Sequence, residues 1–184
     1  SGLDQQPRQI SILALRRAST PLVGRADELE TCRAAWRAAT RGCGTMICLH
    51  GEAGIGKSRL VGELRRLALD SGDGDDGALW LEGRCFESTI STSYAPIVDL
   101  LRDRFRDEDG PDPAIPEDVL VPLLNVLSIP DPRASAFGEL PPAQVKGRTF
   151  LAVAEHLRAL ALERPIVVVL DDLHWADGLT LELV

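Results

Sequence analysis

The chain has 184 residues, of which 45% are hydrophobic and 26% charged, a balance typical of a folded domain rather than of a disordered tail. Its longest apolar run, residues 166–170, is far shorter than the roughly 20 residues that span a bilayer, and nothing near Ser1 resembles a secretory signal. We therefore expect a soluble, cytoplasmic protein without membrane contact. The net charge of −8 argues against a nucleic-acid interface in this segment.

The charge is divided unevenly along the chain. Residues 1–69 hold 11 basic and 6 acidic side chains, whereas residues 70–184 hold 9 and 22. The positive part would suit a small polyphosphate. Only two of the 20 basic residues are lysines, Lys57 and Lys146, so each of them is notable.

The first third of the chain predicts a strand, a loop and a helix in that order. Residues 1–20 show little pattern and are expected to be a linker or the tail of a preceding domain. Residues 27–39 place apolar or small side chains at helical spacing. Residues 45–50 (TMICLH) predict a buried strand, and a glycine-rich turn leads from it to a second helix with an apolar stripe over residues 60–68.

The middle of the chain is less regular. Residues 78–82 predict a strand, and Pro96 can open a short helix after it. Eight of the twelve prolines lie between residues 111 and 142. Residues 107–142 are therefore expected to form an irregular, acidic insertion that holds one short helix at about residues 117–127.

The last third returns to a regular pattern. Residues 143–163 predict a long helix with an apolar face. Residues 166–170 are continuously apolar, as expected for a strand covered on both faces of a parallel sheet. Asp177 can cap a further helix at residues 178–184.

Residues 51–58 read GEAGIGKS, which fits the phosphate-binding pattern of Gly, four residues, Gly, Lys and then Ser or Thr. The glycines would let backbone N–H groups curl around phosphate oxygens. Lys57 would reach the β and γ phosphates, and the Ser58 hydroxyl would be a ligand to Mg²⁺. The alternative is a glycine-rich turn with a surface lysine. The predicted nucleotide-binding residues of this segment are Gly51, Glu52, Ala53, Gly54, Ile55, Gly56, Lys57, Ser58 and Arg59.

A pair of acids follows the apolar strand at residues 166–170. Asp171 is placed to orient Mg²⁺ through its water shell, and Asp172 to position or polarise the attacking water. Lys57 and Asp172 are thus the predicted catalytic residues. Asp172 is one methylene shorter than a glutamate, so hydrolysis is expected to be slow. The alternative is that both acids only cap the next turn.

Three segments together resemble a known family. PLVGRADELE at residues 21–30, GEAGIGKSRL at 51–60 and VVLDDLHWAD at 168–177 are similar, in order and spacing, to the nucleotide-binding module of the STAND ATPases. These AAA-related signal-transduction ATPases occur in large ATP-binding LuxR-type regulators and beside class III nucleotidyl cyclases. The resemblance covers residues 21–184. It implies an α/β fold, the three-layer P-loop NTPase core with a parallel sheet of the ASCE/AAA type, with ATP or ADP and Mg²⁺ as ligands.

The resemblance also suggests contacts at the edges of the site. In this family the segment that matches residues 22–25 lies against adenine, so Val23 and Arg25 become candidate contacts to the base. The alternative is a turn that leads into a helix. His174 and Trp175 match the family's HW pair, and we expect Trp175 to pack while the role of His174 stays open.

Members of this family continue beyond the segment that matches residues 168–177. A fourth strand would lie between those predicted at residues 45–50 and 166–170, followed by a helical region, a winged helix and an output domain. The resemblance therefore identifies residues 21–184 as the N-terminal part of a P-loop NTPase domain, truncated after the Walker B strand. We expect this piece alone to be inactive and to associate through exposed strand edges.

The sequence supports two hypotheses about the function. The first is an ATP-binding, slowly hydrolysing switch in a multidomain bacterial regulator, whose partners are its own C-terminal domains, a second copy on ATP binding, and DNA only through a domain outside residues 1–184. The second is a nucleotide-bound scaffold or oligomerisation module without significant turnover. A small-molecule kinase explains neither PLVGR nor DDLHWAD, and a GTPase lacks its NKxD pattern because Asn125 is the only asparagine.

Overall fold

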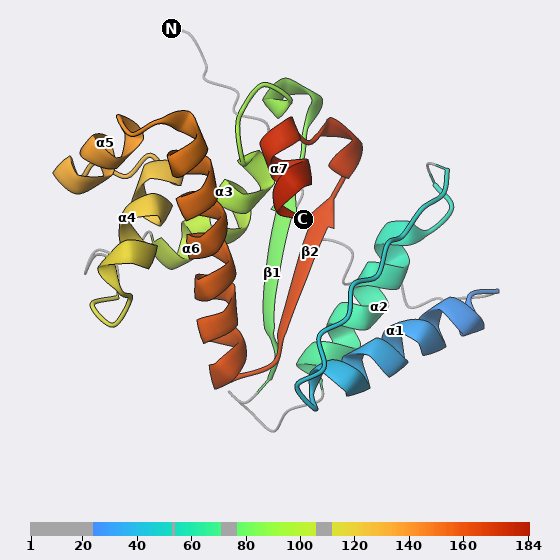
Figure 1. Ribbon diagram of the computed structural model, residues 1–184. Helices are drawn as coiled ribbons and strands as arrows, with labels where there is room; N and C mark the ends of the chain where they lie inside the picture. Colours follow the sequence, from blue (N-terminus) through green and yellow to red (C-terminus); the bar gives the residue numbers. More distant parts are fainter. Residues whose placement is uncertain (1–23, 53, 71–76, 106–111) are drawn as a thin grey trace, which may run out of the picture. The chain divides into compact units, whose positions relative to one another are not determined.

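The computed structural model describes residues 24–52, 54–70, 77–105 and 112–184 (Figure 1). The chain divides into two compact units, residues 1–77 (unit 1) and 78–184 (unit 2), and each is described by itself. The expected linker at residues 1–20, Val23 and Ala53 lie outside the described residues.

Unit 1 consists of two helices and the segment that joins them. Helix α1 spans Ala26–Ala39 and helix α2 spans Lys57–Leu69, which confirms both predicted helices. The two helices contact each other, but few of their side chains are buried. Only Cys32 on α1 and Leu60 and Ala68 on α2 are buried among the described residues of these helices.

The strand predicted at residues 45–50 is wrong for this structure. The segment has no regular hydrogen bonding, and no described residue pairs with it as a neighbouring strand. A strand needs such a neighbour because its own N–H and C=O groups cannot bond to one another. Met46 is 73% and Leu49 36% exposed, so the apolar run that indicates a buried strand remains in contact with solvent.

Unit 2 contains a two-stranded parallel sheet. Strand β1 spans Leu79–Arg84 and strand β2 spans Ile166–Asp171, which confirms both predicted strands. The register pairs Leu79 with Ile166 and Arg84 with Asp171, so the two strands end side by side. Val168 on β2 is 37% exposed, and the expected covering of both strand faces is not seen within unit 2.

The helices on the connection from β1 to β2 gather on one side of the two strands, and a further helix follows β2 (Figure 1). Helix α3 packs on β1, and α4 packs on both α5 and α6. Among the described residues, no helix is long and apolar enough to cross a bilayer. The helices of unit 2 are α3 (Ala95–Arg102), α4 (Glu117–Val126), α5 (Pro132–Gly138), α6 (Pro142–Glu163) and α7 (Gly178–Leu183), with short 3₁₀ turns η3 (Glu87–Thr89), η4 (Asp103–Phe105) and η5 (Leu173–Trp175).

The proline-rich segment is more regular than expected. Its described part holds two helices, α4 and α5, rather than one, because several of the prolines stand at helix starts. Pro116 precedes α4, while Pro132 and Pro142 are the first residues of α5 and α6. Proline is well tolerated at a first helical position, where its missing N–H has no intrahelical partner to lose. Composition alone therefore gave the wrong expectation of irregular structure.

The core of unit 2 lies between the sheet and these helices. Leu101, Leu123 and Leu124 are almost fully buried. A β-carbon on Gly83 of β1 would lie 2.0 Å from the carbonyl oxygen of Pro96, so α3 approaches the strand as closely as a glycine permits. The core cluster comprises Leu81, Tyr94, Ile97, Leu100, Leu101, Phe105, Leu120, Leu123, Leu124, Ala134, Ala152, Val153 and Leu160.

Candidate functional site

The glycines of residues 51–58 adopt backbone conformations that other residues rarely adopt. Gly51, Gly54 and Gly56 have φ values of +153°, +80° and +99°. Gly56 is also the residue that precedes α2, so the loop runs directly into a helix N-terminus. A β-carbon on Gly51 would lie 3.2 Å from Cγ2 of Ile55. This geometry fits a loop that brings backbone N–H groups toward an anion at the positive end of a helix.

Lys57 is folded over this loop. Its Nζ donates hydrogen bonds to the carbonyl oxygen of Gly51 at 2.8 Å and to that of Glu52 at 3.0 Å. Both acceptors are neutral, so a phosphate oxygen would form a stronger, charge-assisted bond with the same ammonium group. Lys57 is thus positioned to exchange loop carbonyls for an anionic ligand.

Arg25 connects the segment at residues 24–30 to the loop. Its Nη2 donates to the carbonyl oxygen of Ile55 at 2.9 Å, and its Nη1 donates to Oε1 of Glu28 at 2.9 Å. The structure therefore brings Arg25 and the loop together, as expected if both belong to one site. Its predicted contact to a nucleotide base remains a prediction.

The other predicted residues of the loop are accessible to solvent. Glu52, Gly54, Ile55 and Ser58 are exposed, and Arg59 is half-buried. An exposed Ser58 in the first turn of α2 can present its hydroxyl to a bound metal ion or phosphate. Ala53 lies outside the described residues.

The predicted metal ligand Asp171 is the last residue of β2. Its Oδ1 accepts a hydrogen bond from the backbone N–H of Asp172 at 3.0 Å, and its Oδ2 lies 3.7 Å from Nε of Arg84. Arg84 is its register partner at the end of β1, and the backbone N–H of Arg84 donates to Oδ2 of Asp99 at 3.2 Å. The Asp171 side chain is 37% exposed, which leaves it accessible to a hydrated cation.

Asp172 lies in an unusual backbone conformation. Its φ of +57° is left-handed, a region that aspartate tolerates better than most residues. The carboxylate is half-exposed, and its Oδ1 lies 4.0 Å from Nδ1 of His174. His174 is exposed, and its ring centroid lies 4.9 Å from that of the half-buried Trp175. The turn therefore directs both Asp172 and His174 to solvent rather than into the core.

Asp177 fixes the segment that follows these acids. Its Oδ1 accepts hydrogen bonds from the backbone N–H groups of Leu179 at 2.9 Å and Thr180 at 3.2 Å, which confirms the predicted cap of α7. Its Oδ2 accepts the hydroxyl of Thr180 and, at 3.0 Å, the backbone N–H of Tyr94. One carboxylate thus ties α7 to the residue before α3.

The carboxylates also affect a buried thiol. Cys85 follows β1 directly, and its N–H donates to the carbonyl oxygen of Asp171 at 3.0 Å. Burial raises the pKa of this thiol, and the negative charges of Asp172, Asp177 and Asp171 raise it further. The electrostatic potential at the end of the sheet is therefore negative, which would favour a bound cation.

Sequence reasoning missed Arg84, Asp99 and the role of Tyr94. All three gain their positions from pairing that a single sequence does not reveal: the strand register places Arg84 beside Asp171, and α3 carries Asp99 to the end of β1. The phosphate loop belongs to unit 1 and the acids at residues 171–172 to unit 2, so the structure assembles each group within its own unit.

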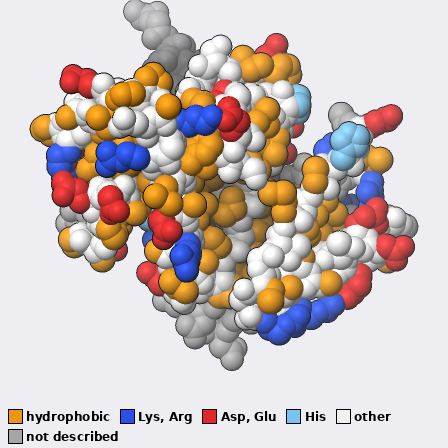
Figure 2. All heavy atoms as spheres, viewed as in Figure 1, with side chains coloured by type: hydrophobic (Ala, Val, Ile, Leu, Met, Phe, Trp, Pro, Cys, Tyr) orange, Lys and Arg blue, Asp and Glu red, His pale blue; other side chains and the backbone are white. Residues whose placement is uncertain are grey.

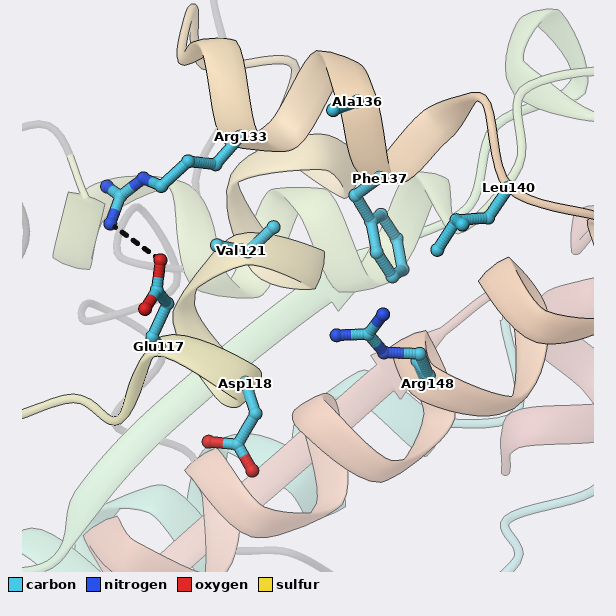
Figure 3. A pocket seen from close by; sticks show the side chains of 8 residues that line it. All are labelled: Glu117, Asp118, Val121, Arg133, Ala136, Phe137, Leu140 and Arg148. Carbon is cyan, nitrogen blue, oxygen red and sulfur yellow. Dashed lines mark hydrogen bonds and ion pairs between the residues drawn. The ribbon is translucent and has the colours of Figure 1, made fainter.

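A large hollow in unit 2 contains none of the predicted nucleotide-binding residues. It has a volume of about 680 Å³ and lies among α4, α5 and α6 (Figure 3). The guanidinium of Arg148 lies 5.0 Å from the ring centroid of Phe137, and Arg133 pairs with Glu117 at 3.4 Å. Acidic and basic side chains are interspersed over these helices (Figure 2).

The loop, its helix and the parallel sheet that ends in acidic residues are consistent with a P-loop nucleotide-binding α/β protein. A family model described as an AAA ATPase domain matches residues 21–184. The chain belongs to this family, whose fold is the P-loop NTPase α/β fold. Membership supports nucleotide binding and ATPase activity in general terms, with Mg²⁺ as the usual metal.

One curated relative is similar over most of the chain. It is an uncharacterised protein of Rhizobium meliloti (strain 1021), 26% identical over 193 residues. The match covers 92% of this chain but only 17% of the relative. No solved structure matches the chain significantly. The chain thus spans about a sixth of the length of this relative.

Proposed function

We propose that the chain is the nucleotide-binding part of a larger signalling or transcriptional regulator of the STAND type. ATP with Mg²⁺ would favour one state of this regulator, and slow hydrolysis to ADP would restore the other. The observation that supports this most is Lys57, which bonds to carbonyls of a loop built on three left-handed glycines in a chain of the AAA ATPase family.

The residues fit the proposed ligands. The loop would hold the phosphates with its backbone N–H groups, and Lys57 would exchange its bonds to Gly51 and Glu52 for the β and γ phosphates. Arg25, already bonded to the loop, would lie on the base side. Mg²⁺ would neutralise charge on the phosphates, with the Ser58 hydroxyl as a ligand and Asp171 acting through the water shell of the ion.

Asp172 would position the attacking water. Its left-handed turn directs the carboxylate away from the core, but the side chain is short, so we propose slow turnover. Partners would include the remainder of the same protein and a second copy on ATP binding, whereas DNA would be contacted only by a domain outside residues 1–184. The site is proposed to work in the cytoplasm.

Phosphate release from ATP by the intact protein tests this proposal. We expect slow, Mg²⁺-dependent release that falls at least about tenfold in Lys57→Ala and in Asp171→Asn. Glu155→Gln, an exposed charge change on α6, serves as the control and should release phosphate at the normal rate. Tight ATP binding without any turnover would contradict the switch and favour the scaffold. Equal rates in all variants would remove both residues from the site.

A further inference from the structure

Unit 2 has a second hollow, with a volume of about 600 Å³. It lies between the end of α4, the first turns of α6 and the beginning of α7. Its volume is in the range of sites that hold small organic molecules. The side chains of Tyr94, Val145 and Leu179 contribute apolar walls, and Ser93 and Lys146 add polar groups. A mainly apolar hollow with a few convergent polar groups is the usual form of a small-molecule site.

Lys146 is the only lysine besides Lys57, and it is not among the predicted nucleotide-binding residues. Its Nζ lies 5.6 Å from the ring centroid of Phe150 and pairs with the carboxylate of Glu182 on α7. The side chains of Lys146 and Glu182 are 37% and 56% exposed. Because exposed ion pairs are weak, another carboxylate can replace Glu182 at little cost.

Thr149 lies one turn beyond Lys146 on α6 and lines the same hollow. It is fully buried, and its Oγ1 has no hydrogen-bond partner among the described residues. A buried hydroxyl without a partner is unfavourable, so Thr149 is a locally unsatisfied point beside the hollow.

The opposite wall is also unusual. Tyr94 has a left-handed φ of +60°, which is rare for a bulky residue. The conformation is maintained by the hydrogen bond from its N–H to Asp177 and by the edge-on packing of its ring on Phe150, with centroids 6.2 Å apart. Strained residues of this kind gather at sites that bind ligands.

We propose that this hollow binds a small organic monocarboxylate. The carboxylate would take the place of Glu182 at Lys146, and the apolar body would lie against Tyr94, Val145 and Leu179. The single negative charge follows from the single ammonium group, and the carboxylate follows from Glu182, which shows the kind of group that this cation accepts. The proposal does not depend on nucleotide binding.

Binding would have a consequence for α7. The pair between Lys146 and Glu182 joins the first turns of α6 to the end of α7, so its replacement frees Glu182 from α6. The cap by Asp177 at the start of α7 would remain. We therefore expect faster hydrogen exchange at the end of α7 when the hollow is filled.

Hexanoate and hexanamide, which differ in charge but hardly in size, are suitable probes for the intact protein. By calorimetric titration we expect hexanoate to bind in the millimolar range, consistent with a ligand of its size, and hexanamide about two- to fivefold more weakly. Lys146→Met, which keeps an unbranched side chain over Phe150, should weaken hexanoate binding by about the same factor. Glu182→Gln should strengthen it several-fold, because the competing carboxylate is removed while α7 keeps its cap.

Lys146→Met should weaken hexanoate binding, and Glu182→Gln should strengthen it. These opposite changes in affinity distinguish a carboxylate site from a packing defect. Equal binding of hexanoate and hexanamide would overturn the proposal, as would unchanged or weaker hexanoate binding by Glu182→Gln. Since Glu182 is exposed, this second variant remains informative even if Lys146→Met fails to fold. Faster hydrogen exchange at residues 181–183 with hexanoate, and not with hexanamide, would support the exchange at Lys146.

Discussion

The two units of the chain contrast in how they are held together. Unit 2 has a continuous core of leucines between a parallel sheet and its helices, with Leu101 and Leu123 at 0% exposure. Unit 1 has two helices in contact, few buried side chains and an apolar segment at residues 45–50 that stays exposed. The phosphate loop therefore depends mainly on local backbone geometry, whereas the acidic end of the sheet depends on long-range packing.

The largest effect is expected from a core truncation in unit 2. Leu123→Ala should lower the free energy of unfolding by about 2–5 kcal/mol, because it leaves a cavity in a closely packed core. Met46→Ala in unit 1 should change it by no more than about 0.5 kcal/mol, since Met46 is 73% exposed. Denaturant unfolding measures both. Similar losses in the two variants would contradict the contrast between the units.

Two glycine substitutions should change the free energy of unfolding in opposite directions. Gly83→Ala on β1 would place its β-carbon 2.0 Å from the backbone oxygen of Pro96, so we expect a loss of about 1–3 kcal/mol or more as β1 and α3 separate. Gly62→Ala on α2 meets no atom within 4 Å and should gain about 0.5–1 kcal/mol from helix propensity. Thermal and denaturant unfolding check both values. A tolerated Gly83→Ala would show that α3 does not pack on β1 as described.

A cap substitution sharpens the comparison at the end of the sheet. Asp177→Ala removes the acceptor for the N–H groups of Leu179, Thr180 and Tyr94, and we expect a loss of about 0.5–2 kcal/mol. Asp177→Asn retains acceptor capacity and should recover most of this loss. Hydrogen exchange of residues 178–183 would locate the effect. Normal protection of α7 in the alanine variant would exclude Asp177 as its cap.

The smallest expected effect concerns acid sensitivity of unit 2. His156 is 5% exposed on α6, packs on Phe105 with ring centroids 5.6 Å apart, and has no partner for its Nε2 among the described residues. Burial lowers its pKa below the ordinary 6.5 and Arg104 lowers it further, while Asp112 and Glu163 act in the opposite direction.

The unfolded chain therefore takes up this proton at a higher pH than the folded chain does. The contribution of neutral His156 to stability is complete above the unfolded pKa of 6.5 and declines as the pH falls toward the lower folded pKa. Unfolding measured between about pH 7.5 and 5.5 should show this decline, and His156→Phe should reduce it. His174→Asn, at an exposed histidine, serves as the control. An identical pH profile in His156→Phe would contradict this account.

The sequence predicted most elements correctly where local signals decide them. Helical spacing located α1, α2 and α6, and the phosphate-binding pattern placed a glycine-rich loop before α2, where the structure has glycines with positive φ. Two expectations failed because they depended on context. The apolar run at residues 45–50 has no neighbouring strand among the described residues, and Pro116, Pro132 and Pro142 stand at the starts of α4, α5 and α6 instead of breaking them.

Other parts of the candidate site had no signal in a single sequence. The register that places Arg84 beside Asp171 depends on strand pairing, and the bond from Tyr94 to Asp177 joins residues 83 positions apart. The left-handed turn at Asp172 is likewise a property of the folded chain. Pattern reasoning thus selected residues by their chemical groups and gave no indication of those that position them.

Calorimetric titration of the intact protein with ATP and Mg²⁺ tests whether the loop at residues 51–58 binds the phosphates of ATP through Lys57. Lys57→Ala removes the only ammonium group bonded to this loop among the described residues, and Arg41→Ala removes an exposed positive charge elsewhere in unit 1. We predict that Lys57→Ala weakens ATP binding at least about tenfold, through the loss of charge-assisted bonds to phosphate, while Arg41→Ala leaves it unchanged. ATP affinity that is the same in Lys57→Ala as in the unaltered protein would contradict the account.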